Sequence, residues 1–130
     1  MEETGLQVLI VDDHVMVRQV IRSILDGYAD IQVVGEASTG VEAINLVTQF
    51  RPRIVLMDIN MPQMNGIEAT AHIMRRYPDT IIIGLSVHAT TENHKAMIHA
   101  GAVQLIPKEQ AVELLYDAVQ RALQSRDMSG

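Results

Sequence analysis

The sequence predicts a doubly wound α/β fold, in which helices cover both faces of a parallel sheet. Five short apolar runs alternate along the chain with segments that have helical spacing. Three of the runs are almost continuously apolar, as expected of central parallel strands that are buried on both faces. Strands that alternate with helices in this way form βαβ units, and the strands of such units are parallel.

The five predicted strands differ in how continuously apolar they are. The first, third and fourth have few interruptions, whereas the second contains Glu36 and the fifth leads into Pro107. Because proline is tolerated at sheet edges, the second and fifth strands are placed there. The flavodoxin-like order 2-1-3-4-5 satisfies this arrangement. The predicted strands cover residues 6–11, 30–37, 53–57, 80–85 and 102–106.

The five predicted helices each have start and stop signals. The second begins with a capping-box pattern from Thr39 to Glu42 and ends before Pro52. The first and fifth cover about 15–25 and 110–123. The third begins after Asn65-Gly66 and stops before Pro78, and the fourth begins near 90–92 and stops at Gly101. We expect these side chains to face the core: Val17, Val20, Ile21, Ile24 and Leu25 in the first helix, and Leu114, Leu115, Ala118, Val119 and Leu123 in the fifth. Arg18, Arg22 and Ser23 should lie on the opposite side of the first helix.

Composition indicates a single domain over residues 1–130, with its core at about 6–123. The 130 residues are 48% hydrophobic, and domains commonly have ~100–150 residues. The chain has no cysteine, its start MEETGLQ lacks a basic region, and no apolar run approaches the ~18 residues of a membrane span. We therefore expect a cytoplasmic protein that does not enter a membrane. A net charge of −6 without a basic run argues against direct nucleic-acid binding by this domain.

Polar residues follow four of the predicted strands. Asp12 and Asp13 follow the first strand, Asp58 the third, Ser86 the fourth and Lys108 the fifth. All these positions lie at the carboxyl edge of a parallel sheet. A doubly wound sheet opens a ligand crevice there, between its first and third strands. The three aspartates are therefore expected to meet in this crevice.

Three neighbouring carboxylates repel one another unless a cation binds among them. Oxygen ligands favour Mg²⁺, with Asp13 and Asp58 as direct ligands and Asp12 bound directly or through water. Lys108 supplies a second positive charge, and the Ser86 hydroxyl can reach an oxyanion. This set suits phosphoryl transfer, which depends on positioning and charge stabilisation. Asp58 can then be both a metal ligand and a nucleophile, because an ionised carboxylate needs no general base.

Five stretches follow one another in the order of the predicted strands: VLIVDDH, VVGEASTGVEAI, PRIVLMDINMPQMNGIEAT, IIIGLS and IPKE. Together they resemble the receiver domain of bacterial two-component response regulators over about 6–123. The resemblance implies that Asp58 accepts a phosphoryl group from a histidine kinase or phosphotransfer protein. It also implies an acidic pair for Mg²⁺, a backbone carbonyl ligand from Asn60, and a hydroxyl and lysine for the phosphoryl group at Ser86 and Lys108.

The sequence departs from the family pattern near its fifth strand. Leu105 stands where the family often has an aromatic switch residue, so a rotating aromatic side chain is not carried over. Pro107 precedes Lys108, whereas the family often has a cis proline after the lysine, so the cis bond is not carried over either. His88 lies two residues beyond Ser86. It is either a modulator of water access to the phosphoryl group or an ordinary loop histidine.

The predicted function is a phosphorylation-controlled signalling switch that is not an enzyme. A phosphohydrolase of the haloacid-dehalogenase type needs an acid two residues after its nucleophile, where Asn60 stands. A flavodoxin-like nucleotide binder needs a Ser-, Thr- and Gly-rich loop, whereas DDHVMV is anionic. A receiver-like scaffold that is not phosphorylated remains an alternative because of Leu105.

The larger context of the domain stays open. The start VDDHVMVRQVIRSIL resembles receivers joined to a C-terminal helix-turn-helix domain, and GLSVH resembles receivers at the C-terminal end of hybrid sensor kinases. A homodimer could form through the first and fifth helices, or through the fourth helix, fifth strand and fifth helix.

Overall fold

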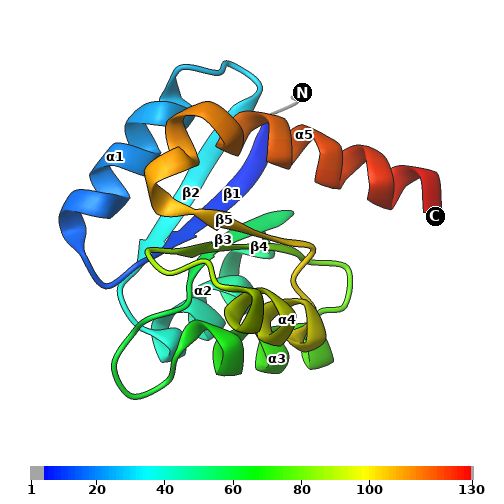
Figure 1. Ribbon diagram of the computed structural model, residues 1–130. Helices are drawn as coiled ribbons and strands as arrows, with labels where there is room; N and C mark the ends of the chain where they lie inside the picture. The colour runs from blue at the N-terminus through cyan, green and yellow to red at the C-terminus, as the bar shows by residue number, and fades with distance from the viewer. Residues whose placement is uncertain (1–4, 130) are drawn as a thin grey trace.

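The computed structural model describes residues 5–129 and confirms the predicted α/β fold. Figure 1 shows a central sheet with α1 and α5 on one face and α2, α3 and α4 on the other. The strands are β1 (Leu6–Val11), β2 (Ile31–Ala37), β3 (Ile54–Asp58), β4 (Ile81–Ser86) and β5 (Gln104–Pro107). The helices are α1 (Val15–Asp26), α2 (Gly40–Phe50), α3 (Gly66–Arg76), α4 (Thr91–Ala100) and α5 (Ala111–Ser129), with a short 3₁₀ helix η1 (Lys108–Gln110).

The sheet is parallel throughout and has the predicted order β2-β1-β3-β4-β5. β1 and β3 pair directly, with Val11 opposite Met57. Their carboxyl ends therefore lie side by side. This is the switch point of the sheet, because the chain proceeds from β1 to β2 toward one edge and from β3 to β4 and β5 toward the other. This is the position at which the sequence places the crevice.

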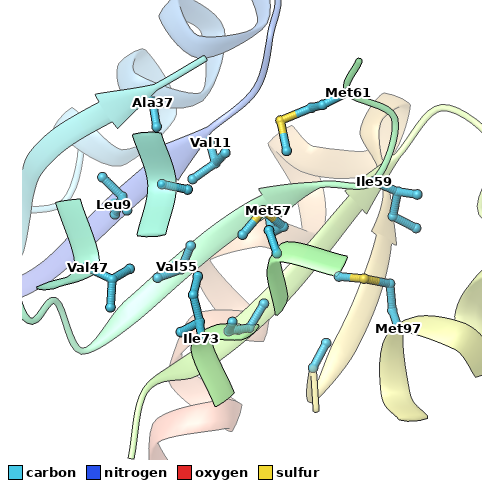
Figure 2. Close-up of a cluster of buried hydrophobic side chains, with 14 of the residues drawn as sticks. Leu9, Val11, Ala37, Val47, Val55, Met57, Ile59, Met61, Ile73 and Met97 are labelled. Carbon is cyan, nitrogen blue, oxygen red and sulfur yellow. The ribbon is translucent and has the colours of Figure 1, made fainter. Parts of the chain in front are cut away.

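The core consists of two clusters, one on each face of the sheet. Alternate residues of the central strands point to opposite faces, so both faces are apolar and the strands read as continuous hydrophobic runs. The cluster under α2, α3 and α4 includes Leu9, Val11, Val55, Met57, Ile73 and Met97, which Figure 2 shows packed together. The cluster under α1 and α5 includes Ile10, Ile21, Leu56, Ile83, Leu115 and Val119.

Two residues predicted to face the core do not. Val20 is 53% exposed and Leu114 is 38% exposed, because the faces of α1 and α5 that meet the sheet are centred on Ile21 and on Leu115. A residue one position away is turned by about 100° around the helix axis, and this carries it to the flank of a narrow apolar face. The prediction for α5 was also too short, since the helix continues to Ser129.

The capping box predicted for α2 is only half present. The Thr39 side chain accepts a hydrogen bond from the Glu42 backbone N–H, but the Glu42 carboxylate accepts from Ser38 instead of from Thr39. The complete capping box is at the start of α3, where Asn65 and Glu68 bond reciprocally.

The start of α3 lies against the end of β3. The Gly66 N–H donates to the Ile59 carbonyl at 2.8 Å. A Cβ at Gly66 would lie only 2.0 Å from the Asp58 carbonyl oxygen. Glycine is therefore required here by close backbone approach, and α3 holds the main chain of Asp58 in place.

The described residues have regular peptide bonds and contain no membrane-spanning helix. All peptide bonds in the range 5–129 are trans, including the bond before Pro107. In the same range, no helix combines the length and the apolar character needed to cross a bilayer.

Candidate functional site

The aspartates that follow β1 and end β3 come together as the sequence predicts. Asp12 is fully buried and Asp58 is 1% exposed, while Asp13 is partly exposed. One carboxylate oxygen from each of these residues lies within 4.8 Å of the others, and a ring nitrogen of His14 belongs to the same group. The parallel pairing of β1 with β3 brings these positions together, because both strands end at the same edge.

Lys108 reaches this cluster from the start of η1, directly after β5. Its Nζ lies 2.6 Å from Asp12 Oδ2 and 3.1 Å from Asp58 Oδ1. Burial alone would lower the pKa of Lys108, but its contacts with Asp12 and Asp58 outweigh burial and raise it. The lysine is therefore a cation that bridges two buried carboxylates.

The charges around Asp58 are still mainly negative, although Lys108 lies beside it. Burial, and then the charge of Asp12, raise the pKa of Asp58 to about 6, although Lys108 and the Asn60 backbone N–H both oppose the rise. Asp58 Oδ2 is buried and has no hydrogen-bond partner among residues 5–129. A buried, unsatisfied carboxylate oxygen beside two other carboxylates fits a hard divalent cation. The residues present therefore suit Mg²⁺.

Ser86 and Asn60 lie at the same edge with different partners. Ser86 is buried at the end of β4, and its Oγ accepts a hydrogen bond from the His88 backbone N–H at 3.0 Å. Asn60 is exposed, and its own backbone N–H donates to Asp58 Oδ1 at 3.2 Å. The structure thus ties Asn60 directly to Asp58 and places the Ser86 hydroxyl toward the loop after β4.

The two candidate modulators occupy different environments. His88 is exposed in the loop between β4 and α4. Leu105 is only 7% exposed and belongs to the core cluster under α2, α3 and α4. A Cβ at Gly84 would lie 2.8 Å from both Leu105 Cδ1 and Met97 Cε. Leu105 is therefore an aliphatic core residue whose side chain lies close to Gly84 of β4.

Two residues of this site were not identified from the sequence. His14 Nδ1 lies 3.1 Å from Asp13 Oδ1, although no local sequence pattern distinguishes His14 from an ordinary residue at the start of a helix. Arg18 was placed on the outer face of α1, but its side chain is 16% exposed and donates to the Asp12 carbonyl at 2.6 Å. No sequence signal separated Arg18 from a solvated helix arginine, because its partners come from β1 and β2.

Glu36, which lies on the edge strand β2, binds the side chain of Arg18 on α1. Glu36 Oε1 lies 3.0 Å from Arg18 Nε, and Oε2 lies 2.6 Å from an Arg22 nitrogen. Burial alone would raise the pKa of Glu36, but the hydrogen bonds and charges of Arg22 and Arg18 lower it overall. Through Arg18, the Glu36 carboxylate helps to hold the main chain at Asp12.

Replacing Glu36 with glutamine is expected to lower the free energy of unfolding by ~1 kcal/mol at pH 7, as measured by urea denaturation. Because the folded pKa lies below the ordinary value of 4.5, this stabilisation is present above about pH 4.5 and is lost as the pH falls through the folded pKa. Asp117→Asn is the control, since Asp117 forms an exposed pair with Arg121. An equal effect of both variants at pH 7 would contradict the role given to Glu36.

Comparisons with known proteins agree with this fold. Residues 8–120 match the family model described as response regulator receiver domain. The transcriptional regulatory protein DegU of Brevibacillus brevis is 36% identical over 117 residues, which cover 90% of this chain and 50% of DegU. A protein-glutamate methylesterase/protein-glutamine glutaminase of Hahella chejuensis is 40% identical over 107 residues, covering 81% of this chain and 30% of that protein.

A solved structure gives the same result. The LuxR-family two-component response regulator of Aurantimonas sp. SI85-9A1 superposes with a TM-score of 0.90 at 30% identity, covering 95% of this chain and 88% of that structure. The chain spans half or less of the length of the two curated relatives named above.

Proposed function

The chain belongs to the response regulator receiver domain family, and from this we propose that it is a signalling switch controlled by phosphorylation of Asp58. We take residues 1–130 as one receiver domain. The observation that carries the proposal is the environment of Asp58. Its carboxylate is buried at the end of β3, faces Lys108, and keeps one oxygen without a hydrogen-bond partner in the described part of the chain.

In the proposed reaction, Asp58 takes a phosphoryl group from a phosphohistidine of a histidine kinase or phosphotransfer protein. A carboxylate oxygen attacks phosphorus, an O–P bond forms and the N–P bond breaks. The bonding electrons return to the imidazole nitrogen, which then takes a proton from solvent. The rise in the pKa of Asp58 to about 6 still leaves the carboxylate mainly ionised at neutral pH.

The neighbouring residues have distinct roles in this proposal. Asp13, Asp58 and the Asn60 carbonyl would hold Mg²⁺, with Asp12 bound directly or through water. The ion would supply positive charge to the phosphoryl oxygens. Lys108 lies 3.1 Å from Asp58 Oδ1 and is placed to pair with the phosphoryl group. The Ser86 hydroxyl would exchange its bond with the His88 amide for one with a phosphoryl oxygen.

Output would follow from the added charge at Asp58, which shifts an existing equilibrium in the β4–α4 loop, α4 and β5. We propose that the domain assists its own phosphorylation and dephosphorylation without being an enzyme for another substrate. The methylesterase named above shares only 30% of its length with this chain, and its activity is not extended to it. With a net charge of −6, the domain is not proposed to bind nucleic acid directly.

The test is to incubate the protein with Mg²⁺ and a small phosphodonor and to follow its intact mass. We expect one phosphoryl adduct on the wild-type protein and none on Asp58→Asn. Asp79→Asn is a matched control, because Asp79 is an exposed aspartate outside the site. An adduct on Asp58→Asn equal to that on the wild-type protein would contradict the assignment.

The alternative, a receiver-like scaffold that phosphorylation does not regulate, is favoured by one observation. Leu105 is a buried aliphatic residue and cannot act as a rotating aromatic switch. NMR spectra recorded before and after phosphorylation separate the two proposals. A switch predicts shifts of amide resonances in α4 and β5, whereas a scaffold predicts shifts confined to the residues around Asp58.

A further inference from the structure

His14 lies beside the acidic cluster, and the proposed function does not use its imidazole. Nδ1 is 3.1 Å from Asp13 Oδ1 and 3.3 Å from Asp12 Oδ1. His14 is the N-cap residue of α1, and its backbone N–H donates to Asp12 Oδ1 at 2.8 Å. The main chain therefore fixes this residue next to the carboxylates, independently of any contact that the ring makes.

The separations match those of neighbouring ligands around one six-coordinate cation. In an octahedron with bonds of about 2.1 Å, adjacent ligand atoms are about 3.0 Å apart and opposite ones about 4.2 Å. The distances of 3.1 Å and 3.3 Å from Nδ1 to the two carboxylates fit adjacent positions. The donor atoms of His14, Asp12, Asp13 and Asp58 all lie within 4.8 Å of one another, so small side-chain shifts would bring them to the separations of ligands around one ion.

A second observation points independently to a bound cation here. Asp58 is 1% exposed, and its Oδ2 has no hydrogen-bond partner among the described residues. Lys108 contacts the other oxygen of Asp58 and Oδ2 of Asp12, whereas Nδ1 of His14 is near Oδ1 of Asp12. The lysine and the imidazole thus approach different oxygens, and both can be present with an ion.

We propose that His14 supplies a nitrogen ligand to the cation held by Asp12, Asp13 and Asp58, and that this ligand raises the affinity of the site for first-row transition-metal ions such as Ni²⁺ relative to Mg²⁺. Imidazole nitrogen suits Ni²⁺, Zn²⁺ and Cu²⁺, whereas carboxylate and carbonyl oxygens alone suit Mg²⁺. In the tautomer required, Nδ1 is the ligand and Nε2 carries the proton. This inference rests on the cation site of the proposed function and adds a ligand residue to it.

Two measurements on the untagged chain test the inference. With Mn²⁺ as the probe, pulsed electron paramagnetic resonance should detect a coordinated ¹⁴N nucleus in the wild-type protein and none in His14→Gln. In equilibrium competition against a metal-binding dye, His14→Gln should weaken Ni²⁺ binding about tenfold or more, as loss of a ligand does, and Mg²⁺ binding less than about threefold. The control is His94→Gln, an exposed histidine on α4, which should leave both affinities unchanged.

The possible results separate this inference from the proposed function. If Mn²⁺ binds without a nitrogen signal and His14→Gln leaves the Ni²⁺ affinity unchanged, the ring is only hydrogen-bonded to the carboxylates and the inference is wrong. Mg²⁺-dependent phosphorylation of Asp58 would survive that result. If neither Mn²⁺ nor Mg²⁺ binds to the wild-type protein, both the inference and the cation site of the proposed function are overturned.

Discussion

Replacing Gly66 with alanine is expected to lower the free energy of unfolding by ~3 kcal/mol or more, since overpacking against an atom that cannot move aside is costly. The added Cβ would lie 2.0 Å from the carbonyl oxygen and 2.8 Å from the carbonyl carbon of Asp58. These are backbone atoms of a central strand, so neither β3 nor the first turn of α3 can yield without breaking other bonds. Urea denaturation followed by circular dichroism measures the change.

Gly27→Ala is the matched control for this prediction. Gly27 ends α1 with φ −73° and ψ −7°, which any residue adopts, and the nearest atom to an added Cβ is the Ile24 carbonyl oxygen at 3.4 Å. We expect a change within ~1 kcal/mol, in the stabilising direction. Equal unfolding free energies for the two variants would show that α3 is not held tightly against Asp58.

Replacing Lys108 with methionine is expected to lower the free energy of unfolding by ~3 kcal/mol at pH 7.5 without divalent cations, because removing one partner leaves buried charge uncompensated. Methionine keeps much of the apolar stem but leaves Asp12 and Asp58 to face each other. Phosphate uptake from a small donor should also fall strongly, because the cation placed beside the phosphoryl group is gone. Urea denaturation and intact mass measure the two effects.

The pH dependence of this variant has a defined sign. With Lys108 present, the pKa of Asp58 is about 6, above its ordinary value of 3.8, and loss of the lysine removes two of the causes that lower it. A folded pKa above the unfolded one means that protonation favours the folded state. The loss of unfolding free energy in Lys108→Met should therefore be largest above pH 7 and should shrink as the pH falls toward 4.

A double variant shows whether this deficit is due to charge. Adding Asp58→Asn to Lys108→Met removes one of the two repelling carboxylates and should restore most of the lost stability. The coupling in the double-mutant cycle is then large. If the double variant is as unstable as Lys108→Met alone, lost packing of the lysine stem is responsible, and the electrostatic account is wrong.

The strand order and the meeting of the three aspartates could be predicted because both follow from local pattern. Continuous apolar runs identify central strands, and residues that follow parallel strands share one edge. Val20 and Leu114 were misplaced because helical spacing gives the direction of an apolar face but not its width. The contact of Arg18 with the main chain of Asp12 depends on Glu36, 18 residues away on another element, and no local pattern encodes that approach.

The hydrogen bonds around Asp12 tie one side of the site to its neighbours more closely than the other side. The Asp12 N–H donates to Ala37, its carbonyl accepts from Arg18, and its carboxylate accepts from the His14 N–H. On the opposite side, the Ser86 hydroxyl is bonded to the amide of His88, in an exposed loop. Motion that starts at Asp58 should therefore travel in one direction across the sheet, toward β4 and β5. The β1–β2 side would act as the fixed support against which the rest of the domain moves.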